Sequence, residues 1–224
     1  MGEAIGDMLP AAVGVAISPL PIVAVVLMLV TARGRANGPA FLLGWIVGVA
    51  GAGAILLVIA SGADAHAEGQ PADWVNWLKL ILGLGLLALA ATQWRRRPHE
   101  GAEAATPRWM GSLDAFTPAK AGGAGIVLSA LNPKNLLLIV AGMAAIAETG
   151  ISAGEQTVAL LVFTVVASIG VAAPVVIYFA LGERSADLLD RLKTWMTQNN
   201  AVIMAVLLLV IGVKLIGDAI SGVA

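Results

Sequence analysis

The residues best suited to chemistry lie in one short string, Asn132-Pro133-Lys134-Asn135, inside a long apolar stretch of the chain. Lys134 is about 13 residues from either end of that stretch, roughly 20 Å along a helix. Its ammonium group can hold an anion or carry a proton, and the two asparagine amides can donate hydrogen bonds beside it. A structural interpretation stays open, in which the lysine is bound to backbone carbonyls.

A related string, Ser18-Pro19-Leu20-Pro21, lies inside the first apolar stretch, and residues 16–23 align with residues 130–137. Proline lacks an N–H and breaks or kinks a helix. In lipid, the freed backbone groups must find a partner in protein or in a wet cavity. We therefore expect a polar cavity between two helix breaks. The expected substrate-binding residues are Ser18, Pro19, Pro21, Asn132, Pro133, Lys134 and Asn135. Kinks that serve only packing are the alternative.

Three further charged residues, Asp7, Lys214 and Asp218, lie nearer the ends of apolar stretches. Lys214 and Asp218 are four residues apart, so they can form a contact within one helix. These three residues are candidates for coupling to an ion. Alternatively, Lys214 extends to the membrane surface, as we expect Lys79 to do.

The composition indicates which elements must position these residues. Hydrophobic residues make up 59% of the 224 residues and charged residues 12%, about half the roughly 25% typical of a soluble domain. A net charge of −1 argues against nucleic-acid binding. With no Cys, two His, no phosphate-binding loop and no nucleophile motif, we expect neither an enzyme, a metal site nor a cofactor. The chain is predicted to be an all-α integral membrane protein.

Six stretches are long enough to span a bilayer, which takes about 20 apolar residues. They cover approximately residues 6–31, 39–61, 74–94, 121–147, 156–181 and 199–221, with breaks in the first and fourth. Ten of the 13 Lys and Arg residues fall in the first, third and fifth loops. Because basic loops stay in the cytoplasm, we expect a multi-pass protein of the bacterial inner membrane with both termini outside.

The two aligned strings each open a set of three spans, so the two sets would have opposite orientations in the membrane. This is the inverted-repeat plan of many secondary transporters. The predicted units are a first three-helix repeat over 1–97, a cytoplasmic linker over 98–120 and a second three-helix repeat over 121–224. Two cytoplasmic segments, 107–118 and 184–197, have the spacing of short interfacial helices. Ordinary loops with some apolar anchors are the alternative.

With these features the chain resembles the lysine-exporter superfamily, and within it the peptidoglycolipid-addressing or sulfolipid-addressing branch. The resemblance rests on the string from Leu131 to Leu136, on Trp109-x3-Leu113-Asp114-x-Phe116-Thr117-Pro118, and on Gly44-Trp45. It implies a protein that helps move complex glycolipids or their precursors towards the outer envelope. Amino-acid exporters of this superfamily usually carry Pro-Gly-Pro in the first span, whereas this chain has Pro19-Leu20-Pro21.

Three functions are compatible with the sequence. The first is a transporter of an anionic or glycosylated lipid that works by alternating access, with Lys134 holding the head group and Asn132 and Asn135 donating hydrogen bonds. The second is an exporter of amino acids or small solutes, and the third is a membrane scaffold for lipid-synthesis enzymes. The expected partners are membrane lipids, the substrate, lipid-synthesis or export proteins and a second copy of the chain.

Overall fold

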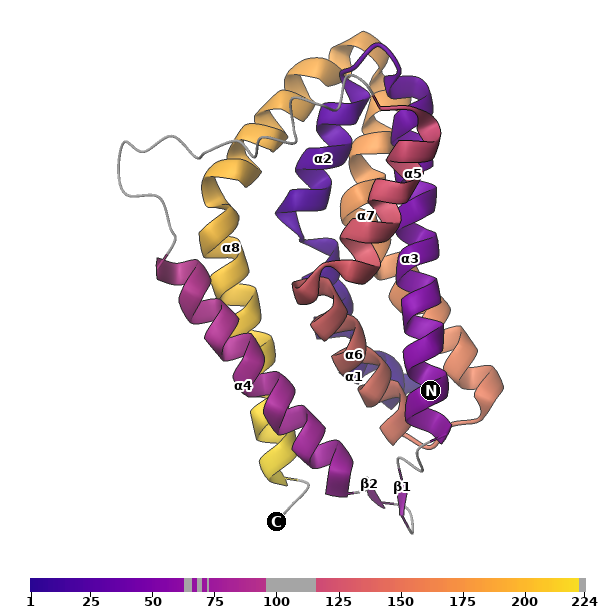
Figure 1. The fold of residues 1–224 in the computed structure, drawn as a ribbon, viewed down its shortest axis with the longest axis vertical. Coiled ribbons are helices and arrows are strands. Elements are labelled where there is room, and N and C mark those ends of the chain that lie inside the picture. The colour runs from indigo at the N-terminus through magenta and orange to yellow at the C-terminus, as the bar shows by residue number, and fades with distance from the viewer. Residues whose placement is uncertain (63–65, 68–69, 72, 96–115, 222–224) are drawn as a thin grey trace.

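The computed structural model describes residues 1–62, 66–67, 70–71, 73–95 and 116–221 (Figure 1). Its helices are α1 (Gly2–Ala16), α2 (Pro19–Leu29), α3 (Gly34–Gly62), α4 (Asp73–Arg95), α5 (Pro118–Ile126), α6 (Pro133–Glu148), α7 (Ala153–Leu181) and α8 (Ser185–Ser221). A π-helix, η2 (Val127–Leu131), joins α5 to α6, and a 3-10 turn, η3 (Gly182–Arg184), joins α7 to α8. Two-residue strands, β1 (His66–Ala67) and β2 (Gln70–Pro71), pair antiparallel and are the departure from an all-α chain.

Four helices, α3, α4, α7 and α8, are each long and apolar enough to span a membrane. Two bent pairs bring the number to as many as six if each pair is one span. The axes of α1 and α2 meet at 48°, and those of α5–η2 and α6 meet at 60°. The chain is therefore a multi-pass membrane protein, and the breaks predicted in the first and fourth spans are present.

Local sequence explains where the helices begin and end. Proline occupies the first turn of α2, α5 and α6, where its missing N–H costs nothing. Ser152 and Glu155 form a capping box at the start of α7. Gly150 and Gly182 have positive φ angles of 62° and 55° in the connections that follow α6 and α7, a conformation that glycine adopts without strain.

One predicted element differs in the structure. Residues 184–197 do not form a separate interfacial helix, because nearly all of them belong to the first part of α8, which continues unbroken to Ser221. No Gly or Pro interrupts the chain between Ser185 and Ile211, so the helix has no reason to stop. Met196 packs against Ile22 and Val23 of α2. Met196 and Leu189 are therefore buried against protein, whereas Leu188 and Trp195 stay exposed.

The predicted linker is described only in part. Helix α5 begins at Pro118, inside the segment 98–120 that we expected to be a linker. Most of the other predicted interfacial helix, 107–118, lies outside the described residues, as does Trp109 of the family string. The predicted division of the chain into units stays a prediction.

The helices pack in two groups. Helices α4 and α8 lie side by side along much of their length (Figure 1). The other group contains α3 packed against α5, and α1 packed against α6 and α7. The buried side chain of Trp45 joins α3 to α7, because its Nε1 donates a hydrogen bond to the carbonyl of Ala167 at 3.3 Å.

Glycines bring α3 and α5 into close contact. A Cβ on Gly44 would overlap the backbone carbonyl of Gly122, and a Cβ on Gly48 would overlap the hydroxyl of Ser129. Small residues allow membrane helices to approach in this way. Gly44 and Gly48 therefore serve packing within the chain, and the face of α3 that carries them is not free for contact with a second copy.

We predict that Gly44→Ala lowers the free energy of unfolding by about 1–3 kcal/mol, because the new methyl group meets backbone that cannot move aside. Gly51→Ala on the same helix is the matched control, since nothing lies within 4 Å of a Cβ at that position. The control should be neutral or slightly stabilised by the better helix propensity of alanine. Thermal unfolding in detergent measures both. Equal stability of the two variants would contradict the close α3–α5 packing.

Candidate functional site at two helix breaks

The first break leaves a backbone carbonyl without its helical partner. In a continuous helix the N–H of Ser18 would bond to the carbonyl of Gly14. Here the N–H of Ser18 bonds to the carbonyl of Val15 at 3.2 Å, and Ser18 adopts an extended conformation as the N-cap of α2. Pro19 has no N–H to contribute. The carbonyl of Gly14 is thus available to a side chain.

The second break has the same character. Helix α5 widens into the π-helix η2, and Asn132 is extended as the N-cap of α6. A π-helical carbonyl bonds to the N–H five residues later, which for Leu128 would belong to Pro133, and proline has none. The side chain of Asn135 bonds there instead, with its Nδ2 donating to the carbonyl of Leu128 at 2.9 Å.

Lys134 connects the two breaks. Its Nζ donates one hydrogen bond to the carbonyl of Gly14 at 3.0 Å and a second, short one to Oγ of Ser18. The hydroxyl of Ser18 in turn donates to Oδ1 of Asn135 at 2.7 Å. The three side chains Ser18, Lys134 and Asn135, called the break network below, therefore bond a freed carbonyl in each half of the chain. This matches the structural interpretation of the lysine that the sequence left open.

The break network is buried on one side and open on the other. Ser18 is 3% exposed and Asn135 is fully buried. Lys134 and Asn132 are half-buried, Pro133 is exposed, and the neighbouring Leu131 is 68% exposed. Pro19 and Pro21 lie in the core of α2. The open side of the second break is the part that another molecule can reach.

Two predicted residues keep hydrogen-bond donors for a ligand. An ammonium group has three protons, and Lys134 uses two of them in these bonds. Asn132 uses its Oδ1 to accept the N–H of Lys134 at 3.1 Å, which leaves its amide protons. Among the described residues, no carboxylate forms an ion pair with Lys134. A ligand at this position meets hydrogen-bond donors, so the site suits a group that accepts hydrogen bonds, such as an oxyanion.

The candidates for ion coupling form a separate cluster at the end of the bundle where the described chain begins and ends. Nζ of Lys214 lies 2.8 Å from Oδ2 of Asp218 and 3.5 Å from Oδ1 of Asp7. The predicted contact between Lys214 and Asp218 is therefore present. These residues line a hollow of about 470 Å³ between α1, α4, α6 and α8.

The same hollow contains an ion pair that the sequence did not indicate. Nζ of Lys79 lies 2.6 Å from Oε1 of Glu148, and the two side chains are 11% and 12% exposed. Our expectation that Lys79 extends to the membrane surface is wrong, because a buried carboxylate is within its reach. The pair joins α4 to α6, which are far apart in the sequence, so no local pattern could have predicted it.

Comparison with known proteins gave one match. A model of the family described as "Sap, sulfolipid-1-addressing protein" matches residues 8–221. This confirms the branch to which the sequence strings pointed, while the wider lysine-exporter placement stays a prediction. Neither the curated proteins nor the solved structures gave a match to the chain.

We predict that Asn135→Leu lowers the free energy of unfolding by about 1–3 kcal/mol, because the carbonyl of Leu128 and the hydroxyl of Ser18 lose their partner in a buried place. Asn132→Ser is the matched control. Serine caps a helix about as well as asparagine, so this variant should lose only a few tenths of a kcal/mol. Thermal unfolding of both proteins in the same detergent measures the difference. Indistinguishable midpoints would show that Asn135 does not hold the second break.

Proposed function

Because the chain belongs to the sulfolipid-1-addressing protein family, we propose that it is a transporter and not an enzyme. Its role is to move, or help export, an anionic or glycosylated lipid across the bacterial inner membrane by alternating access. The family carries the lipid-related part of this proposal. The observation that carries the transport part is the pair of helix breaks joined by Lys134, with donors left over on the open side.

The arrangement of helices supports an inverted repeat. In that plan α1 corresponds to α5, α2 to α6, α3 to α7 and α4 to α8. The packing of α3 against α5 then has its counterpart in α1 against α7, and that of α2 against α8 in α6 against α4. The pair α4 and α8 is its own counterpart. Inverted repeats place substrate sites near the membrane midplane, at discontinuous helices.

The head group of the lipid binds at the second break in this proposal. A sulfate, phosphate or carboxylate oxygen accepts the third proton of Lys134 and an amide proton of Asn132. Asn135 and Ser18 position Lys134, because their own hydrogen bonds are made within the protein. The positive ends of α2 and α6, whose first turns follow Ser18 and Asn132, add to the preference for an anion.

The distribution of basic residues also supports an orientation of the chain in the membrane. The connections between α2 and α3 and between α7 and α8 lie at one end of the bundle, opposite the described end of the chain at Ser221 (Figure 1). These connections carry Arg33 and Arg184. The excess of basic residues supports a cytoplasmic location for this end. The cluster of Asp7, Lys214 and Asp218 then lies at the outer end, where it can exchange ions with the exterior.

We predict that Lys134→Met slows lipid transport about tenfold or more, since a hydrogen bond to a charged group contributes about 1.5–3 kcal/mol. The measurement is the translocation of a fluorescent sulfated glycolipid in proteoliposomes, with thermal unfolding as a check on folding. Lys120→Met is the matched control, because Lys120 is exposed in the first turn of α5, and it should transport normally.

Each contrary result has a distinct meaning. Unchanged transport by a folded Lys134→Met variant would remove Lys134 from the site. If the unaltered protein moves no lipid but exports amino acids, the substrate class is wrong. If it moves neither, the protein acts as a scaffold and the transport proposal fails.

We also predict that breaking the ion pair of Lys79 with Glu148 makes the hollow at the outer end of the bundle more accessible to a thiol reagent. The chain has no cysteine, so a single cysteine in place of Thr149, which lines the hollow, reports access to a membrane-impermeant thiol reagent. Glu148→Gln should raise the labelling rate several-fold, because α4 loses its tie to α6. Asp187→Asn is the control, since it breaks the exposed pair with Arg191 in α8 and should leave labelling unchanged. Equal rates in all three proteins would show that the pair does not close this end.

A further inference from the structure

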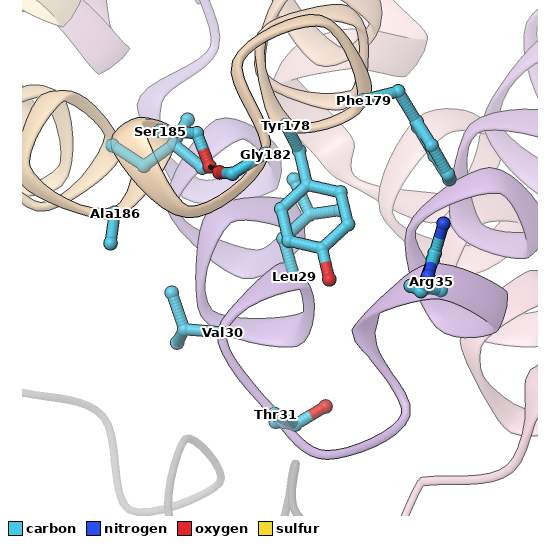
Figure 2. A pocket seen from close by; sticks show the side chains of 10 residues that line it. Leu29, Val30, Thr31, Arg35, Tyr178, Phe179, Gly182, Ser185 and Ala186 are labelled. Carbon is cyan, nitrogen blue, oxygen red and sulfur yellow. Dashed lines mark hydrogen bonds between the residues drawn. The ribbon is translucent and has the colours of Figure 1, made fainter.

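A second hollow lies at the opposite end of the bundle from the ion-pair cluster. It forms where α2 ends, α3 begins, α7 ends and α8 begins, and its volume is about 440 Å³ (Figure 2). None of its lining residues belongs to the break network or to the cluster around Lys214. It is therefore a separate feature, and neither the sequence strings nor the family match assigns a role to it.

The polar groups that line this hollow offer donors to a ligand. Arg35 is the charged residue among the described lining residues, and it forms no ion pair with any other described residue. The hydroxyl of Tyr178 has no hydrogen bond within the described part of the chain, and it points into the space between Thr31 and Arg35 (Figure 2). A guanidinium group and a phenol both donate to an oxyanion.

The other two hydroxyls in the lining are already used. Thr31 donates to the carbonyl of Met28 at 2.7 Å, and Ser185 donates to the carbonyl of Gly182 at 2.6 Å. Their oxygens can only accept further bonds. Among the described lining residues, the side chains with free donors are thus Arg35 and Tyr178, and none of these residues is acidic. The chemistry favours a phosphate or sulfate group.

The other lining residues are apolar, and they favour an anion that belongs to a lipid over a free inorganic anion. Leu29 and Leu189 form a buried wall, while Val30 is 58% exposed and Phe179 is 50% exposed. In a membrane-spanning chain, such exposed apolar side chains face acyl chains. A free inorganic anion would fill the polar part and leave these surfaces without a partner. A lipid satisfies both parts at once.

We propose that this hollow binds the head group of an anionic membrane lipid. A phosphate or sulfate oxygen of the lipid accepts hydrogen bonds from Arg35 and Tyr178, and the acyl chains lie along Val30 and Phe179. The volume is within the range of about 300–1,000 Å³ that is usual for small-molecule pockets. The site does not depend on the proposed function, since a lipid can occupy it whether or not the protein transports one.

The test uses the purified full chain in a neutral detergent at about 0.3 M salt, which screens diffuse attraction to exposed charges. The probes are a short-chain phosphatidylglycerol, a short-chain phosphatidylcholine and inorganic sulfate, with binding measured by titration calorimetry. We expect the anionic lipid to bind at least about tenfold more tightly than the zwitterionic lipid, because only the former presents an unpaired negative charge to Arg35.

The variants distinguish a specific binding site from non-specific electrostatic attraction. Arg35→Gln should weaken binding of the anionic lipid about tenfold or more, and Tyr178→Phe by about two- to tenfold, in keeping with a charged and a neutral hydrogen bond. Arg33→Gln is the matched control, since Arg33 lies just before α3 and is exposed, as Arg35 is, but does not line the hollow. Any lipid bound at Lys134 would contribute equally to all of these variants, so a loss of affinity confined to Arg35→Gln and Tyr178→Phe reports this hollow alone, whatever the outcome of the transport assay.

Three results would overturn the proposal. Equal affinity for the anionic and the zwitterionic lipid would show that the negative charge of the head group does not determine binding. Sulfate that binds as tightly as the anionic lipid would make this a site for free anions. An effect of Arg33→Gln as large as that of Arg35→Gln would indicate diffuse attraction and no built site.

Discussion

The fold depends on the hydrogen bond from the ammonium group of Lys134 to the backbone carbonyl of Gly14. A carbonyl freed inside a membrane has no water to bond to, so a broken helix needs a partner from elsewhere in the protein. Lys134 supplies that partner from the other half of the chain, and Asn135 does the same for Leu128 within its own half. The first break therefore depends on the second half of the chain, and the hydrogen bond from Ser18 to Asn135 links the two breaks.

This constraint shapes how charge is distributed along the molecule. At the centre, Nζ of Lys134 is held by neutral oxygens and has no carboxylate partner among the described residues. At one end, carboxylates and lysines neutralise each other in the pairs of Lys79 with Glu148 and of Lys214 with Asp7 and Asp218. At the other end Arg35 has no acidic partner among the described residues. Lys134 and Arg35 therefore differ from Lys79 and Lys214, which have acidic partners among the described residues.

The sequence predicted those features that depend on local chemistry. Proline at positions 19 and 133 was enough to place both breaks, and apolar length was enough to place the spans. Which carbonyl Lys134 would bind was not predictable, because Gly14 carries no signal of its own. The partners Lys79 and Glu148, and the lining residues Arg35 and Tyr178, lie on different halves of the chain and meet only through packing. The polar residues of 184–197 resemble a surface helix, so the predicted sixth span begins only at residue 199. Nothing in that segment ends a helix, and α8 therefore begins at Ser185.

The packing of α1 against α6 has a consequence for the shape changes open to this fold. Under the proposed repeat its counterpart would be α2 against α5, yet among the described residues those two helices have no comparable packing. The two halves thus share a sequence plan but differ in how their broken helices pack. If each half took up the packing of the other, α2 would pack against α5 and α1 would separate from α6. Under the proposed alternating access, this exchange of contacts would give the second conformation, and it would require Lys134 to release the carbonyl of Gly14.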